Sequence, residues 1–337
     1  MVFLDYASTC PIVKFSSKQY DGFHCNPNAA YAYEERKALM DCEERIKAAI
    51  GVKSGHVLYF RCATEAIDWL VGDIGGRAHS PYEHDACTLG VGIAPEKVVA
   101  ADFYINQWVN HITGEIFDLK TIRSQLPETC KLIVDATAGF GKAKLPSGLD
   151  NIADALFMSG HKIGCPELSF MWLSDNLCKW LGAAKDIRNQ WGLHHGSLSV
   201  ASVMALTDAV EWACENGDRV DGHSVRLYVQ MNDMLDKARV EHHDVLEHQM
   251  FTCSINAIRL NGINADALQQ FLATRGVYVG VGGSACSAAH DYRVLRAYGL
   301  TDGEASEVIR VSFGDETTAS DIEALVEGIK EYRRQFC

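Results

Sequence analysis

Two residues at the ends of predicted buried strands, a lysine and an aspartate, are best placed to carry chemistry. Lys162 follows Ser159-Gly160-His161 and is flanked by Gly160 and Gly164. A lysine that is partly desolvated at a strand end becomes nucleophilic enough to form a Schiff base. Asp135 ends the predicted strand Leu132–Asp135, beside a turn of small residues. Taken alone, a lysine at this position is more often a solvated loop residue. An aspartate at this position is more often a helix cap or turn residue.

Together the two residues match the needs of one cofactor. Pyridoxal phosphate requires a lysine for its aldehyde and a carboxylate against its ring nitrogen, which keeps the ring an electron sink. The pair Lys162 and Asp135 therefore predicts a pyridoxal-phosphate site, provided that the two strands end close together.

The elements that would position these residues alternate between short apolar runs and amphipathic stretches. Tyr33–Ile50 has acidic and basic residues on one face and predicts a helix. This alternation predicts an α/β domain with a mostly parallel sheet. The strands predicted for it are Val57–Phe60, Val98–Tyr104, Leu132–Asp135, Ala155–Ser159 and Ser169–Leu173.

After the helical run Ser199–Asn216 the pattern changes to that of a smaller α+β domain, closed by a helix over Ala319–Arg334. We therefore expect an N-terminal segment over residues 1–14, a large domain over 15–215 and a small domain over 216–337. The strands predicted for the small domain are Met250–Leu260, Val277–Val281 and Val308–Phe313.

Composition excludes several other classes of protein. A formal net charge of -13 argues against direct nucleic-acid binding, which needs clustered Lys and Arg. The sequence has neither a membrane span nor an apparent secretory signal. Its 12 cysteines include no C-x-x-C pair, so neither a metal site nor a disulfide framework is predicted. Reduced thiols and a cytoplasmic location are expected.

Ordered motifs along nearly the whole chain resemble the cysteine desulfurases, in the class V aminotransferase group of fold-type I pyridoxal-phosphate enzymes. The paired signatures are VDATAGFGK at 134–142 and SGHKIGCPE at 159–167. Agreement of many motifs in the right order is far more specific than any one motif. The others are FLDYAST at 3–9, CNPNAAY at 25–31, ATEAID at 63–68, GSLSV at 196–200, GGSACS at 282–287 and VIRVSFG at 308–314.

The resemblance implies a role for each of several residues around the cofactor. Lys162 would hold the cofactor aldehyde and later move the substrate α-proton, while Asp135 would pair with the ring nitrogen. His84 would stack on the ring and assist proton transfer, although a surface loop histidine is the plainer interpretation. Ser197 would reach the phosphate of a neighbouring subunit, which implies a homodimer. The remaining phosphate ligands would come from Ala63, Thr64, Ser159 and His161.

Two further residues would bind the substrate. Arg310 lies in an apolar strand, where an unpaired guanidinium is costly. A bound substrate carboxylate would satisfy it, and an internal salt bridge is the competing interpretation, ranked second. Asn110 resembles, through a looser local match, a family asparagine near the cofactor and the substrate carboxylate.

Cys286 determines the expected reaction. Its context, Gly-Ser-Ala-Cys-Ser after a further glycine, predicts an exposed loop. In the family this cysteine takes sulfur from L-cysteine, which leaves L-alanine and a persulfide. A protein acceptor would then receive the sulfur, with an iron–sulfur scaffold, a tRNA-thiolation enzyme and a DNA-modification partner as the candidates. The alternative for Cys286 is that it is one of several unremarkable cysteines.

The sequence also departs from the family pattern. Ala138 stands where a glutamine usually donates to the cofactor ring oxygen, and Cys62 replaces a glycine of the phosphate turn. Three alternatives stay open: a selenocysteine lyase, an aminotransferase, or a non-catalytic partner in a sulfur-transfer complex, and Ala138 weighs slightly for the last.

Overall fold

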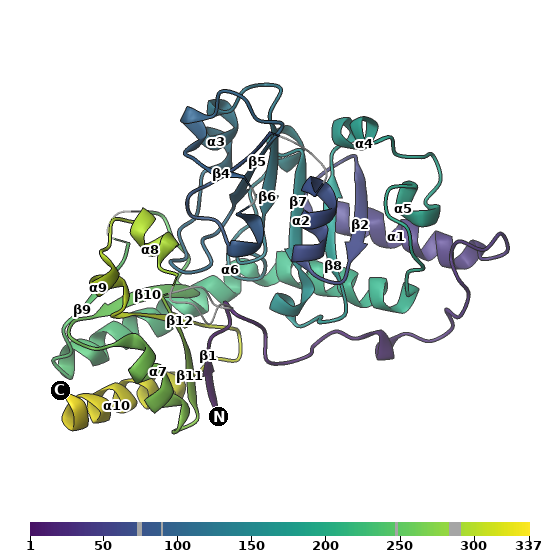
Figure 1. The fold of residues 1–337 in the computed structure, drawn as a ribbon. Coiled ribbons are helices and arrows are strands. Elements are labelled where there is room, and N and C mark those ends of the chain that lie inside the picture. Colours follow the sequence, from purple (N-terminus) through teal and green to yellow (C-terminus); the bar gives the residue numbers. More distant parts are fainter. Residues whose placement is uncertain (73–75, 89, 247–248, 283–290) are drawn as a thin grey trace.

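The computed structural model describes residues 1–72, 76–88, 90–246, 249–282 and 291–337. Over these residues the chain forms a seven-stranded sheet and a five-stranded sheet, each packed with helices (Figure 1). None of the described helices is both long and apolar enough to cross a membrane.

The larger sheet is mostly parallel, as the sequence predicts. Its strand order is β2-β8-β7-β6-β5-β3-β4, in which β8 is antiparallel to both neighbours and the other described strands share one direction. Its strands are β2 (His56–Phe60), β3 (Arg77–His79), β4 (Val91–Gly92), β5 (Phe103–Gln107), β6 (Lys131–Asp135), β7 (Ala155–Ser159) and β8 (Ser169–Leu173).

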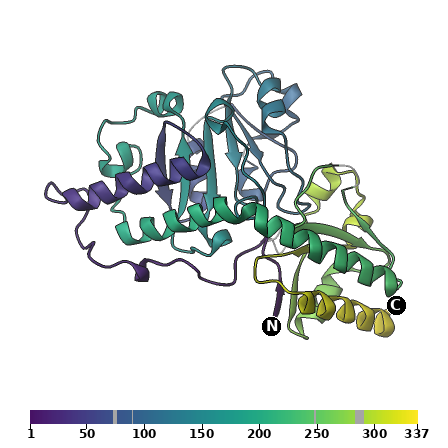
Figure 2. The ribbon, with the colours of Figure 1, turned by 180° about the vertical axis from the view of Figure 1, so that it is seen from behind.

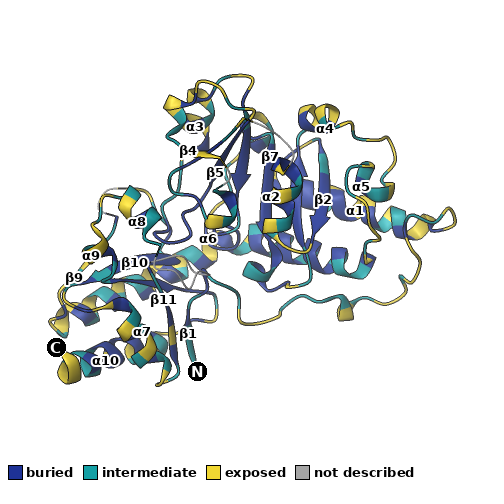
Figure 3. Cartoon of the chain, in the orientation of Figure 1, coloured by how far each residue is buried: buried dark blue, intermediate teal, exposed yellow. Residues whose placement is uncertain are grey.

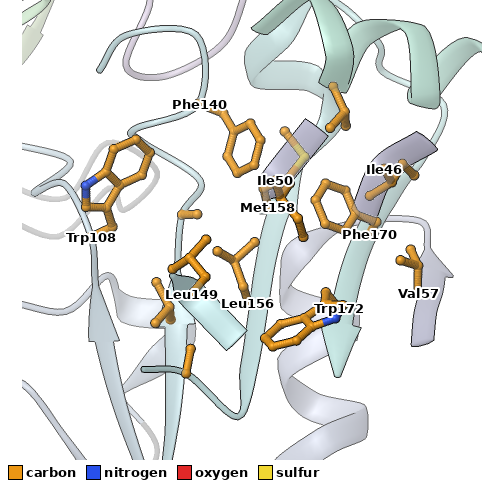
Figure 4. Close-up of a cluster of buried hydrophobic side chains, with 14 of the residues drawn as sticks. Ile46, Ile50, Val57, Trp108, Phe140, Leu149, Leu156, Met158, Phe170 and Trp172 are labelled. Carbon is orange, nitrogen blue, oxygen red and sulfur yellow. The ribbon is translucent and has the colours of Figure 1, made fainter. Parts of the chain in front are cut away.

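Helices cover both faces of this sheet, and alternate strand residues serve opposite faces. In β2, Val57 and Tyr59 join the core under helices α1 and α6, while Leu58 and Phe60 join the core under α2 and α4. Figure 2 shows α1 and α6 across one face, and Figure 3 shows the buried strands between the helix layers. Figure 4 shows part of the first core. The helices of this part are α1 (Tyr33–Ile50), α2 (Ala63–Val71), α3 (Leu119–Gln125), α4 (Asp175–Leu181), α5 (Arg188–Trp191) and α6 (Val200–Lys237).

The smaller sheet has the order β1-β11-β12-β10-β9, so the first strand of the chain pairs with strands near its end. Its strands are β1 (Val2–Leu4), β9 (His242–Asp244), β10 (Ile255–Leu260), β11 (Val277–Val281) and β12 (Val308–Ser312). The helices that follow β10 are α7 (Ala265–Ala273), α8 (Arg293–Ala297), α9 (Asp302–Ala305) and α10 (Ala319–Phe336).

Helix α6 connects the two parts and is longer than expected. The prediction ended this helix at Asn216, but the helix continues through Gly217 to Lys237. Gly217 allows close packing rather than ending the helix, because a Cβ there would lie 2.8 Å from the carbonyl oxygen of Ala143. Leu206 belongs to the core of the larger sheet and Leu235 to that of the smaller one. The division between the cores therefore falls within one helix.

Two predicted strands begin later than expected. The run predicted from Val98 forms β5 only from Phe103, since Val98 closes a 3-10 turn on Pro95 and Val99 is exposed. The run predicted from Met250 forms β10 only from Ile255. Apolar composition alone did not distinguish these loop residues from strand residues.

We expect Leu206→Ala to destabilise the protein by about 2–5 kcal/mol, because it removes a fully buried side chain from α6 and leaves a cavity. Val225→Ala on the same helix is the matched control, since Val225 is 42% exposed and should change stability by less than about 0.5 kcal/mol. Denaturant unfolding of both variants measures the difference. Equal small losses would contradict the packing of α6 described above.

Candidate active site

Lys162 and Asp135 line one cavity of about 750 Å³, a volume that includes space open to solvent. Asp135 is the last residue of β6, and Lys162 lies on the 3-10 turn that follows β7. The two strands are parallel neighbours, so their carboxyl ends meet at one edge of the sheet. The structure thus brings together the two residues on which the cofactor prediction rests. Other predicted site residues that line this cavity are Ala63, Thr64, His84, Ser159 and His161.

The amine of Lys162 is held by the N-terminal segment of the chain. Its Nζ donates to the carbonyl oxygens of Ala7, at 2.5 Å, and Ser8, at 2.6 Å. Ser8 also lines the cavity. The N-terminal segment therefore contacts the amine of the site.

The carboxylate of Asp135 is nearly buried and is oriented from within its own turn. Its Oδ1 accepts from the backbone N–H of Thr137 at 2.8 Å. Its Oδ2 lies 3.8 Å from the sulfur of Cys87, which is placed to donate. These contacts fix the carboxylate plane at the wall of the cavity.

His84 lies in the cavity wall rather than in a surface loop. Its Nδ1 accepts from the backbone N–H of Ala86 at 3.1 Å, so a neutral ring carries its proton on Nε2. Burial lowers the pKa of His84, and the nearby charge of Lys162 acts in the same direction. The neutral ring packs edge-on against His111, with 5.0 Å between ring centroids.

The start of α2 and the turn after β7 also line the cavity. Ala63 and Thr64 are the first two residues of α2, where unpaired N–H groups and the helix dipole favour an anion. Cys62 caps the helix, because its sulfur accepts from the N–H of Glu65 at 3.5 Å. The residue that departs from the family glycine thus serves as the helix cap.

Ser159 and His161 bring polar atoms to this wall. The hydroxyl of Ser159 lies 3.3 Å from that of Ser169. Nδ1 of His161 lies 3.1 Å from the hydroxyl of Thr9. Burial lowers the pKa of His161 to about 4, and the charges of Lys162 and Lys142 contribute. His161 is therefore a neutral hydrogen-bonding residue near pH 7.

Asn110 does not line the cavity, so the geometry gives no support to its predicted role in substrate binding. Its Oδ1 accepts from the N–H groups of Ile112 and Thr113, each at 2.9 Å. Its Nδ2 donates to the carbonyl of Tyr82 at 3.3 Å. The amide is thus used to shape the turn after β5.

Arg310 is fully buried and forms the internal salt bridge that the sequence ranked second. Its guanidinium pairs with Asp5 at 2.7 Å and donates to the carbonyl of His111 at 2.9 Å. Its Nε has no hydrogen-bond partner among the described residues. Arg310 is not part of the cavity wall, and a role in binding substrate stays a prediction.

The last two predicted residues are Ser197 and Cys286. Ser197 is exposed and is not part of the cavity of its own chain. Cys286 lies outside the described residues. The roles of both stay predictions.

Gln107 and His111 are among the residues of the cavity wall that were not predicted. Oε1 of Gln107 lies 3.2 Å from the backbone N–H and 3.1 Å from Nδ1 of His111, so Nδ1 carries the ring proton and Nε2 is an acceptor. Burial lowers the pKa of His111 well below its usual value. The sequence could have indicated Gln107 by its position at the end of a strand. This was missed because the predicted strand stopped at Tyr104.

Comparisons with known proteins point to the same family that the sequence motifs resemble. Residues 100–325 match the family model described as aminotransferase class-V. A putative cysteine desulfurase NifS of Halalkalibacterium halodurans is 23% identical over 98% of both chains. A cysteine desulfurase IscS of Mannheimia succiniciproducens is 26% identical over 98% of this chain and 92% of its own.

Solved structures share the fold of the whole chain. A NifS-like protein superposes with a TM-score of 0.83 at 19% identity, covering 99% of this chain and 100% of that one. A NifS-like protein from Rickettsia africae superposes with a TM-score of 0.81 at 16% identity, covering 99% of both chains.

We expect the ring of His161 to stay neutral between about pH 5 and pH 8, because its pKa is lowered to about 4. Ring proton resonances followed by NMR, and assigned by their loss in His161→Gln, measure this directly. A titration midpoint near the usual value of about 6.5 would contradict the buried environment of His161.

Proposed function

Because the chain belongs to the class V aminotransferase family, we propose that it is a cysteine desulfurase that converts L-cysteine to L-alanine and retains the sulfur as a persulfide on Cys286. Members of this family are pyridoxal-phosphate enzymes, and the chain has the expected fold-type I architecture. The observation that carries the proposal is the meeting of Lys162 and Asp135 in one cavity. Relatives named cysteine desulfurases that align over almost the whole chain support the choice of reaction.

The described residues fit each part of pyridoxal phosphate. Lys162 offers an amine for the aldehyde, and Asp135 a carboxylate for the ring nitrogen. The first residues of α2 offer amides for the phosphate. Ala138 in the same wall offers no side-chain donor, but the neighbouring hydroxyl of Thr137 is buried without a partner among the described residues. We assign Thr137 as the donor that replaces the family glutamine.

When bound, pyridoxal phosphate supplies an electron sink for the bonds at the substrate α-carbon. The amine of Lys162 takes the α-proton and returns it. His84 presents its Nε2 proton to the cavity while its Nδ1 is occupied by Ala86. Because His84 and His111 have lowered pKa values, they act as neutral donors and acceptors.

Arg310 is proposed to bind the substrate carboxylate, as expected from the sequence. In this structure Asp5 is its counter-ion, so the substrate would have to take the place of Asp5. The exchange replaces one carboxylate with another, so the buried guanidinium is never left without a negative partner.

Cys286 is proposed to accept the sulfur. The substrate sulfur leaves its β-carbon as it bonds to the thiolate of Cys286, and the β-carbon gains the proton that completes the methyl group of alanine. Cys62, a second thiol, lies in the wall of the cavity itself and is the natural competitor. A variant of each cysteine therefore tests the assignment.

The working unit is proposed to be a homodimer. Ser197 is exposed in its own chain and lies outside its own cavity, which suits a residue that serves the phosphate of a second copy. A protein acceptor for the persulfide, and a cytoplasmic location, complete the proposal. The relatives named IscS and NifS support a role in sulfur transfer but leave the acceptor open.

We expect Cys286→Ser to lower the rate of alanine formation on the order of a hundredfold or more, because serine is a poor nucleophile toward sulfur. The variant should still bind L-cysteine and shift the absorption of the cofactor, since Lys162 and Arg310 remain. Alanine release and persulfide labelling are measured in parallel with Cys62→Ala, which should keep most activity.

Normal alanine release by Cys286→Ser, with loss in Cys62→Ala, would move the acceptor role to Cys62. If the parent were inactive on cysteine but formed a keto acid from another amino acid, or released selenium from selenocysteine, the desulfurase proposal would be wrong.

A further inference from the structure

We propose that Glu83 and Cys87 form a buried proton-holding cluster with Asp135, in which Glu83 and Cys87 keep their protons and Asp135 alone carries the negative charge. The part of this inference that concerns the cofactor rests on the proposed function, because it assigns Asp135 to the ring nitrogen. Glu83 and Cys87 are positioning residues in this account, since they act through Asp135.

The carboxyl group of Glu83 lacks the partners that an ionised form would need. Glu83 is fully buried on the segment that leads into His84. Its Oε1 accepts from the backbone N–H of Gln107, whereas its Oε2 has no hydrogen-bond partner among the described residues. Burying an ionised carboxylate with an unpartnered oxygen costs free energy of folding. A protonated Oε2 is instead a hydrogen-bond donor, which can bind a neighbouring acceptor.

Cys87 lies where it can connect Glu83 to Asp135. It is 1% exposed, and its sulfur is 3.8 Å from Oδ2 of Asp135. The sulfur and one oxygen of each carboxyl group all lie within 4.8 Å of one another. A protonated thiol at this place donates to Asp135, and its sulfur is a weak acceptor for the hydroxyl of Glu83.

Charge repulsion decides which of the three groups is ionised. Burial, and then the charge of Asp135, raise the pKa of Glu83 well above its usual value. Burial also raises the pKa of Cys87, with Asp135 and Glu83 adding to it. Asp135 has the compensating contacts, because it accepts from the N–H of Thr137 and shares its cavity with the amine of Lys162. One negative charge therefore stays on Asp135.

The other groups around Glu83 do not outweigh its burial. The charge of Arg293 lowers the pKa of Glu83, but burial and Asp135 have larger effects in the opposite direction. The guanidinium of Arg293 donates to the backbone carbonyls of Pro81 and Glu83 and pairs with Asp85. His84 is a neutral ring because its pKa is lowered, and the pKa of Tyr104 is raised, so its phenol is neutral. The charge of Asp135 raises the pKa of Glu83 and so favours the proton on Glu83.

The cluster has a consequence for the cofactor. A pyridinium nitrogen is stabilised by an ionised partner. The neutral thiol of Cys87 donates to Asp135 and so stabilises its charged form, and a protonated Glu83 adds no competing negative charge. The cluster thus places its single negative charge on the carboxylate assigned to the ring nitrogen.

A metal ion is the competing occupant, because an Asp, a Glu and a Cys at these distances could ligate zinc. Binding would require Glu83 and Cys87 to release their protons into a buried site, which the raised pKa values of both groups oppose. The experiments below distinguish a protonated cluster from a metal-binding one.

The test compares the full-length protein with Glu83→Gln, whose amide keeps one acceptor and one donor in the same shape. An unfolded glutamate loses its proton near pH 4.3, whereas Glu83 keeps it in the folded state. Above that pH the folded wild type holds one more proton than the unfolded chain, so raising the pH destabilises it. The wild-type folding constant should fall by about tenfold per pH unit relative to that of Glu83→Gln, until the folded pKa is reached.

Denaturant unfolding between pH 5 and pH 8, with and without cofactor, measures the ratio of the wild-type folding constant to that of Glu83→Gln. A ratio that is independent of pH, or that rises with pH, would show that Glu83 is ionised in the folded state and overturn the proposal. The measurement needs no catalysis, so its outcome is independent of whether the desulfurase proposal holds.

Infrared spectroscopy supplies a second measurement that does not depend on the variant being stable. The wild type at pH 7 should show the carbonyl stretch of a protonated buried carboxyl group, with the shift expected on exchange into D2O. Absence of this band, or tight binding of added zinc that is lost in Cys87→Ser, would overturn the proposal in favour of an ionised or metal-binding cluster.

Discussion

The parallel pairing of β6 and β7 is the constraint on which the site depends. It places Asp135, the last residue of β6, beside the turn that carries Lys162 after β7. Burial on both faces fixes the register of these strands, since alternate residues serve the two cores. A slip of one residue would turn Asp135 to the other face of the sheet. Packing of apolar side chains far from the cavity therefore determines the position of its carboxylate.

The N-terminal segment joins this edge to the smaller sheet. Its first strand, β1, pairs with β11, and Asp5 just beyond it pairs with Arg310 of β12. A few residues later, the carbonyls of Ala7 and Ser8 accept from Lys162. One short stretch of chain thus contacts the amine of the site and the arginine proposed to bind substrate. Movement of this stretch would change the contacts of both Lys162 and Arg310.

The sequence predicted what local pattern and strand order determine, and missed what depends on tertiary contacts. β7, β8, β11 and α1 have the predicted bounds, because their apolar periodicity is regular. The full length of α6 was missed because the prediction ended the helix at Asn216, and only the fold shows that Gly217 packs against Ala143 within the helix. His111 was missed in favour of Asn110 because only the folded turn shows which neighbouring side chain reaches the cavity. The partner of Arg310 likewise required the fold, since Asp5 is distant in sequence.

The covalent role of Lys162 is the central claim, and one measurement tests it most directly. The protein loaded with pyridoxal phosphate is reduced with borohydride, digested and mapped by mass spectrometry. The account predicts that the pyridoxyl group lies on Lys162, with loss of the cofactor absorption band on reduction. Lys142 is the sharpest competitor, because it is buried and its pKa is lowered to about 8, which makes its amine reactive. An adduct on Lys142 in place of Lys162 would contradict the account.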